Sequence, residues 1–223
     1  MGIGSRTQAA QWVREGRVRV NGKLVSDAEF PVTRGRDLIV IDGHEPAAPA
    51  RLVVMLNKPR GLVTTTRDER GRDTVYKCFE GAELPWLAPV GRLDKASEGL
   101  LLFSNDPAWA ARIIDPTIGP EKTYHVQVNR LPDAALLANL ERGAVVEGER
   151  LAARAARCIR AGGRNAWLEI VLDEGRNRQI RRLLSAFDVS VLRLVRVAIG
   201  SLPLGKLPKG GWRELTTQEM ESL

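Results

Sequence analysis

The sequence predicts an α+β fold: a mixed, mostly antiparallel sheet with flanking helices, preceded by a small α+β module. The chain has 223 residues, 43% of them hydrophobic, which suffices for one or two domains with a core. The segment "HEPAAPA", residues 44–50, is small and contains prolines, so we expect an extended linker between residues 1–43 and 51–223. Helices do not alternate regularly with the predicted strands after residue 51, which favours a mixed or antiparallel sheet.

The first 43 residues predict one helix and one hairpin. Ser5 with Gln8 fits a capping box that opens a helix through about Glu15. "RVRVNGKLV", residues 17–25, predicts a hairpin because Asn-Gly tolerates the positive φ values of a tight turn. A helix followed by an arginine-rich hairpin is typical of small nucleic-acid-binding modules. An ordinary solvated surface is an equally good interpretation of these residues alone.

The second part predicts strands and helices in an irregular order. Apolar runs or alternating apolar and polar residues predict strands at residues 51–58, 61–66, 100–103, 122–128 and 166–172. Asp106 followed by Pro107 fits the start of a helix through Ile114. Residues 132–143 predict a helix that ends at a glycine, and residues 161–164 predict a hairpin turn.

The stretch "GRNRQIRRLLSAFDVS" predicts a helix with two distinct faces. One helical stripe is apolar and consists of Ile180, Leu183, Leu184 and Phe187. A second stripe with the same spacing is basic and consists of Arg178, Arg181, Arg182 and Ser185. Within the predicted helix, no acidic residue stands four positions away to pair with these arginines. We therefore expect one face to pack on the core and the other to meet a negative partner, with a merely solvated helix as the alternative.

The positive charge is concentrated in one segment. Residues 174–213 contain nine basic and two acidic residues, so this segment carries the whole net charge of +7. A balanced chain with one strongly basic region predicts a polyanionic partner, and nucleic acid is the first candidate. An acidic protein or a membrane surface is the alternative. No apolar run approaches the length of a membrane span.

Several kinds of chemistry are excluded by missing motifs. The sequence has no Walker-type loop, no dinucleotide-binding glycine pattern, no His-Glu-x-x-His and no Gly-x-Ser-x-Gly. Cys78 and Cys158 stand far apart, which supports neither a disulfide framework nor a zinc site. For the lone His125 a structural role is the better interpretation. We expect no metal and no cofactor, so any reaction would depend on carboxylates, arginines and a tyrosine. Asp94, in a glycine-flanked loop before a buried strand, is the leading carboxylate.

Four motifs carry a resemblance to a known family. "LNKPRGLVTTTRDERGRDTVY", "GRLDKASEGLLLFSND", "KTYHVQV" and "LDEGRNRQIRRLL" together resemble the RsuA/RluB-type family of ribosomal RNA pseudouridine synthases. Residues 1–43 resemble part of an S4 RNA-binding module. The resemblance implies a pseudouridine synthase fold for residues 51–223. It also implies a cofactor-free enzyme that isomerises a uridine of ribosomal RNA after flipping it out of the RNA.

The resemblance also assigns roles to individual residues. It implies that Asp94 is the catalytic aspartate, that Tyr124 stacks on the target base and assists proton transfer, and that Arg181 pairs with Asp94. Arg92 matches the arginine that fills the gap left by the extruded base. The other expected RNA-binding residues are Lys58, Arg60, Lys122, Arg176, Arg178, Arg182, Arg17 and Arg19. The alternatives are an ordinary loop residue for Asp94 and a core tyrosine for Tyr124.

Two departures from the family pattern refine these expectations. An S4 module typically begins with a helix before its Ser-Arg segment, whereas this sequence starts at "MGIGSR", so we expect that helix to be missing. Asn177-Arg178-Gln179 stands where some relatives have a histidine before the glutamine, which favours the branch acting on large-subunit RNA.

The expected partner is ribosomal RNA or an assembling subunit, and no membrane is expected. We expect the protein to be a monomer in the cytoplasm. A non-catalytic RNA-binding or ribosome-assembly factor, or an enzyme acting on transfer RNA, are the alternatives.

Overall fold

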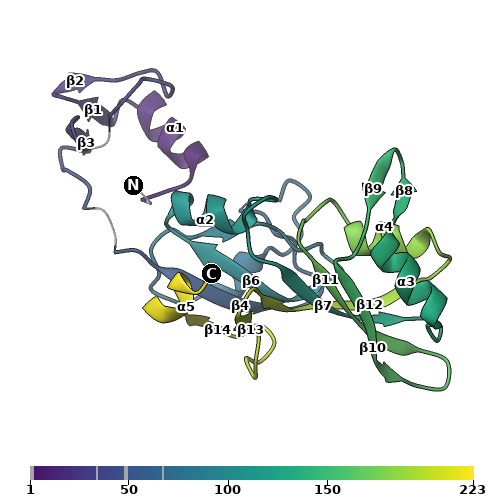
Figure 1. Ribbon diagram of the computed structural model, residues 1–223. Coiled ribbons are helices and arrows are strands. Elements are labelled where there is room, and N and C mark those ends of the chain that lie inside the picture. The colour runs from purple at the N-terminus through teal and green to yellow at the C-terminus, as the bar shows by residue number, and fades with distance from the viewer. Residues whose placement is uncertain (1–2, 34, 48–49, 67) are drawn as a thin grey trace.

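The computed structural model describes residues 3–33, 35–47, 50–66 and 68–223 (Figure 1). Within these ranges the chain forms a three-stranded sheet near its N-terminus, a nine-stranded sheet, and a separate two-stranded hairpin. No helix in the described ranges combines the length and the apolar character needed to cross a membrane.

The N-terminal module has the local structure that its sequence predicts. Helix α1 (Arg6–Arg14) opens on the capping box of Ser5 and Gln8. Strands β1 (Val18–Val20) and β2 (Lys23–Leu24) form the expected hairpin, with positive φ values at both turn residues. Strand β3 (Ile39–Ile41) pairs with the other edge of β1. The predicted linker at 44–50 includes residues 48–49, which lie outside the described residues.

The large sheet is mixed and mostly antiparallel, as predicted. Its strands are β4 (Val53–Lys58), β5 (Ala88–Val90), β6 (Glu98–Ser104), β7 (Lys122–Val128), β10 (Ala155–Ala161), β11 (Ala166–Leu172), β12 (Val191–Ile199), β13 (Leu202–Pro203) and β14 (Trp212–Glu214). The central order is β10-β11-β7-β12-β6-β4-β14, and the pair of β6 and β12 is parallel. Gly99 has φ +101° at this crossing, and a Cβ there would collide with the backbone oxygen of Arg196. The parallel pair therefore depends on glycine at position 99.

Helices pack on the large sheet and form two separate hydrophobic cores with it. Helices α3 (Ala134–Arg142) and α4 (Gln179–Ser185) pack over β7 and β11 and form the larger core. Helices α2 (Pro107–Ile114) and α5 (Thr217–Glu221) cover the second core, which includes residues of β4 and β6. The predicted apolar stripe of α4 is confirmed: Ile180, Leu183 and Leu184 are buried. Burial of each such side chain stabilises the fold by roughly 1.5–3 kcal/mol.

Two further elements flank these layers. The two-stranded hairpin of β8 (Ala144–Val146) and β9 (Glu149–Leu151) projects beside α4 (Figure 1). A short 3-10 helix, η1 (Val75–Phe79), lies between β4 and β5 in the chain and places its first residue in the larger core.

The expectation of a strand at residues 61–66 is wrong. Within this stretch Val63 forms one isolated bridge with Thr74 and no ladder follows. The hydroxyl of Thr64 instead donates to the carbonyl of Leu93 at 2.8 Å and accepts from the Leu93 amide at 3.3 Å. Threonine side chains can replace backbone ladder bonds in this way, so a β-prone sequence becomes a loop fastened to its neighbour.

Candidate active site

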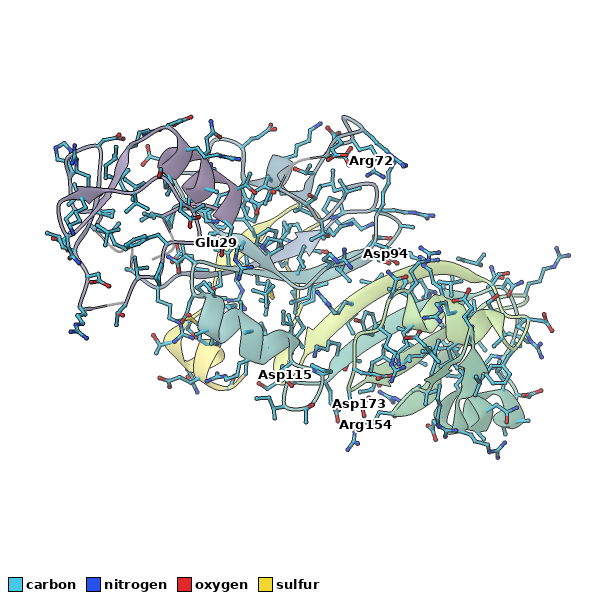
Figure 2. The ribbon with its side chains drawn as sticks, turned by 90° about the horizontal axis from the view of Figure 1, so that it is seen from above. Glu29, Arg72, Asp94, Asp115, Arg154 and Asp173 are labelled. Carbon is cyan, nitrogen blue, oxygen red and sulfur yellow. The ribbon has the colours of Figure 1, made fainter. Side chains whose placement is uncertain are left out.

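A cleft of about 800 Å³ opens beside the centre of the large sheet. Its walls include the loop at residues 90–97, the segment at 172–181 that leads into α4, and the facing ends of β7 and β12. Residues 63–64 and 113–116 also contribute to the lining. Asp94 lies near the middle of the molecule in Figure 2 and lines this cleft. Segments far apart in the sequence thus bring the motif residues of the chain together.

Lys58 holds the loop that carries Asp94. Its side chain is fully buried at the end of β4, and Nζ donates to the carbonyl oxygens of Pro59 at 3.1 Å, Asp94 at 3.2 Å and Ser97 at 2.9 Å. Burial lowers the pKa of Lys58 to about 8, against the opposing charge of Asp94. The expected role of Lys58 as a direct RNA contact is therefore wrong for this structure, because all three donors of the ammonium group are used inside the protein.

Among the described residues, the guanidinium group that contacts the Asp94 carboxylate belongs to Arg178. Its Nη1 lies 3.5 Å from Oδ2 of Asp94. The expected contact between Asp94 and Arg181 is not formed: Arg181 donates to the carbonyl oxygens of Ala96 at 3.3 Å and Val191 at 3.5 Å. These two bonds hold Arg181 half-buried, whereas Arg178, which precedes α4 with φ +50°, is free to extend toward the loop.

Arg181 still lies within electrostatic reach of Asp94. Burial lowers the pKa of Arg181, the charge of Arg178 lowers it further, and the charge of Asp94 opposes both effects. Its Nε is buried without a hydrogen-bond partner among the described residues. The two arginines therefore occupy different positions: one is paired at the open mouth, and the other is fixed against the loop backbone.

The floor of the cleft is built by adjacent strands. Tyr124 is buried on β7, and its partner across the sheet is Arg196 on β12. Lys122 lies two residues before Tyr124 on the same face of β7 and is also buried. All three side chains line the cleft. His125 points to the opposite face, where its Nε2 lies 3.3 Å from a carboxylate oxygen of Glu169.

Sequence reasoning missed Arg196. A usable signal was present, because position 196 is in phase with the inward-facing Leu194 on a strand that has a buried face. A charged residue at an inward position of a strand is uncommon and indicates a buried polar site.

The expected RNA-binding residues fall into distinct groups. Arg92, Lys122, Arg176 and Arg178 line the cleft, and Arg60 is exposed nearby. In the N-terminal module, Arg17 is paired with Asp42 and Glu15, and Arg19 is exposed.

Arg182 differs from what the arginine stripe predicts. It donates to a carboxylate oxygen of Glu149 at 2.7 Å, pairs with Glu147 at 3.0 Å and donates to the carbonyl of Val146 at 3.1 Å. Its side chain is only 18% exposed. Arg182 thus fastens the β8–β9 hairpin to α4, and its expected binding of RNA stays a prediction that these contacts do not favour.

Much of the basic segment is neutralised by carboxylates within the fold. The further pairs are Arg176 with Glu174, Arg193 and Lys209 with Glu98, and Arg213 with Glu219. Helical spacing could not reveal these partners because most come from other elements. Of the basic residues of this segment without a carboxylate partner among the described residues, Arg181 and Arg196 line the cleft. Among the described residues, no group of three or more His, Cys, Asp or Glu side chains is placed to hold a metal ion.

Comparisons with known proteins agree with this architecture. The sequence pattern described as RNA pseudouridylate synthase matches residues 52–186, and that of the S4 domain matches residues 1–38. The chain is 34% identical to ribosomal large subunit pseudouridine synthase B of Bacillus subtilis, covering 100% of this chain and 91% of that protein. It is 40% identical to the protein of the same name from Escherichia coli K12, covering 96% and 76% respectively. A solved structure titled "Crystal structure of pseudouridylate synthase" matches with a TM-score of 0.69 and 30% identity, covering 98% of this chain and 93% of that one.

Proposed function

Because the chain belongs to the RNA pseudouridylate synthase family, we propose that it isomerises a uridine of large-subunit ribosomal RNA, with Asp94 as the catalytic residue. The observation that carries this proposal is the position of Asp94. It lies in a cleft of about 800 Å³, on a loop held by the buried Lys58, with Tyr124 on the cleft floor. A volume of this size accommodates a nucleoside.

The reaction assigns a task to each of the main cleft residues. The target uridine leaves the RNA stack, which requires a few kcal/mol of unstacking energy. Stacking of the extruded base on Tyr124 and insertion of the exposed Arg92 into the vacated position offset part of this energy. Asp94 then acts where the bond between C1′ and N1 breaks. The uracil rotates and rejoins the sugar through C5, and the hydrogen on C5 is released.

Residues outside the cleft serve RNA binding in this proposal. Residues 51–223 form the catalytic domain, residues 44–50 the linker, and residues 1–43 an RNA-binding module that presents Arg17 and Arg19. The substrate is ribosomal RNA, free or in an assembling subunit, and the enzyme acts as a monomer in the cytoplasm. The names of the relatives from Bacillus subtilis and Escherichia coli support a large-subunit substrate.

The test uses ribosomal RNA transcripts labelled with tritium at C5 of uridine. Joining the base through C5 must release that label, so the parent chain is expected to release it stoichiometrically and Asp94→Asn to release none. Free large-subunit RNA, immature large-subunit particles and transfer RNA are compared as substrates. Binding without release on every substrate would support a non-catalytic RNA-binding or assembly factor. Release from transfer RNA alone would reassign the substrate.

A further inference from the structure

Two buried cations share the floor of the cleft, and no ion pair joins either of them to a carboxylate of the described residues. Lys122 is 9% exposed and Arg196 is 5% exposed. Nε of Arg196 donates to the carbonyl of Leu100 at 2.7 Å, but its Nη2 is buried with no hydrogen-bond partner among the described residues. No hydrogen bond or ion pair joins Nζ of Lys122 to a described residue either. Burial and the neighbouring charge of Arg196 lower the pKa of Lys122, and the exposed Asp173 opposes these effects only from a distance.

This arrangement contrasts with the other buried charges around the sheet. Lys58 is bonded to three carbonyl oxygens, and Glu98 is bonded to both Arg193 and Lys209. Burying like charges side by side with an unused donor is unfavourable unless an anion binds there. Among the charged side chains that are buried in the described residues, Lys58 and Glu98 have bonded polar atoms, whereas Lys122 and Arg196 keep unused donors. This difference points to a negative ligand group at the cleft floor.

The location indicates which negative group it is. Tyr124 is next to both cations on the same face: it is the cross-strand partner of Arg196 and stands two residues after Lys122. Phosphate groups of the RNA backbone would meet the exposed arginines at the mouth, Arg92 and Arg178. The base that stacks on Tyr124 reaches the floor of the cleft. The donor groups of Lys122 and Arg196 would therefore meet the edge of the uracil ring.

Given the proposed function, on which this inference rests, we infer that Lys122 and Arg196 stabilise the negative charge that develops on the uracil ring as the glycosidic bond breaks. When the bond between C1′ and N1 breaks, its electron pair leaves with the ring, and the charge spreads over N1, O2 and O4. The two cations donate to the carbonyl oxygens of this anion. When C5 then bonds to C1′, the ring supplies the electron pair and becomes neutral. The C5 proton is then transferred to a base and N1 takes up a proton, so the product is neutral and no oxidant or reductant is needed.

The test combines rate, affinity and stability for Lys122→Met and Arg196→Gln. Each variant is expected to lower the single-turnover rate at saturating RNA by about 10²–10³-fold, as loss of one donor to a developing anion does. The affinity for RNA should stay within about twofold, since the interaction forms only during the reaction. The thermal midpoint of Lys122→Met should stay the same or rise, because the change replaces an unpaired buried charge with an apolar side chain. Lys77→Met, a change of the same kind at an exposed lysine, is the control and should leave the rate and the RNA affinity unchanged.

Replacing uracil by 5-fluorouracil as the leaving group distinguishes stabilisation of the ring anion from a general loss of activity in the variants. The RNA carries 5-fluorouridine at the mapped target position, and loss of the intact nucleoside is measured after nuclease digestion. Fluorine withdraws electrons and stabilises the ring anion by itself. The rate loss caused by either variant should therefore be at least about tenfold smaller with 5-fluorouridine than with uridine.

The opposite results would overturn the inference in distinguishable ways. Equal rate losses on both RNAs, together with a lower thermal midpoint, would mean a structural role. Weaker RNA binding with a normal saturating rate would mean that the two cations hold a backbone phosphate. If Arg196→Gln does not fold, Arg196→Lys replaces it and should keep more activity than Lys122→Met. A parent chain that modifies no RNA at all would refute the proposed function, and the inference with it.

Discussion

Arg178 holds Asp94 through a nitrogen-to-oxygen distance of 3.5 Å, although 84 residues separate them in the sequence. The side chain of Arg178 is 51% exposed and that of Asp94 is 35% exposed, so water reaches the pair. Exposed ion pairs contribute about 0–1 kcal/mol and are easily exchanged. Arriving RNA can therefore take Arg178 as a phosphate contact and leave the carboxylate to Arg181, which is already fixed against the carbonyl of Ala96.

This division of tasks predicts different defects for the two arginines. Arg178→Asn should weaken RNA binding and reduce the slope of log affinity against log salt by about 0.7, as loss of one phosphate contact does. Asparagine tolerates the positive φ at this position, so the fold should be unaffected. Arg181→Gln should instead lower the single-turnover rate at saturating RNA by about 10²-fold. The change removes both the positive charge near Asp94 and the guanidinium bond to the loop carbonyl of Ala96. Filter binding and tritium release measure the two effects. An exchange of the two phenotypes would show that Arg178 is the partner of Asp94 during the reaction.

Arg182 and Arg60 provide a second contrast. Arg182→Ala removes two ion pairs with exposed carboxylates and the bond to the carbonyl of Val146, and it should destabilise the protein by about 1–2 kcal/mol in total. Because Arg182 is occupied inside the fold, the salt slope of RNA binding should not change. Arg60 is exposed and makes no hydrogen bond or ion pair with another described residue. Arg60→Ala should therefore leave the urea midpoint unchanged and reduce the salt slope by about 0.7. A reduced slope for Arg182→Ala would restore that residue to the RNA-binding surface.

Elements governed by local chemistry were predictable from the sequence. The capping box at Ser5, the Asn-Gly hairpin and the Asp106–Pro107 helix start all depend on residues within four positions of each other. The prediction of a strand at residues 61–66 failed because their structure depends on a residue far away in the sequence. Their valine and threonines favour a strand, but the Thr64 hydroxyl is used by Leu93, a residue 29 positions away. No local pattern records such a partner.

The site was predictable in composition but not in its pairing. The motifs placed Asp94, Tyr124 and Arg181 in one region, and all three line one cleft. The partners of the charges were not predictable, since they depend on which strands become neighbours. Glu98 neutralises Arg193 only because β6 lies beside β12. For the same reason Lys58, expected to contact RNA, is the buried support of the loop that carries Asp94.

Lys58→Met tests that support. The methionine side chain has a similar length but leaves the carbonyl oxygens of Pro59, Asp94 and Ser97 without their donor. We expect a loss of about 2–4 kcal/mol in the free energy of unfolding. The released loop should also lower kcat by about 10²-fold with little change in RNA affinity, because Asp94 is displaced rather than removed. Urea unfolding and tritium release are the measurements. Full activity in Lys58→Met would mean that backbone contacts alone position the loop.

The pH dependence of stability provides an independent signature of the buried lysine. The folded pKa of Lys58 is lowered from 10.5 to about 8, so between these values the unfolded chain binds a proton that the folded chain lacks. Stability rises with pH wherever the unfolded state binds more protons. The parent chain should therefore gain stability relative to Lys58→Met from pH 8 to pH 10, by at most about 1.4 kcal/mol per pH unit.

Lys77, whose exposed ammonium group has its pKa raised by the bond to Asp73, is the matched control. Its contribution is present below its unfolded pKa and is lost as the pH rises through the folded pKa, so the parent should show no such gain relative to Lys77→Met. Parallel pH profiles for the parent and Lys58→Met would mean that the ammonium group of Lys58 is solvated in the folded protein.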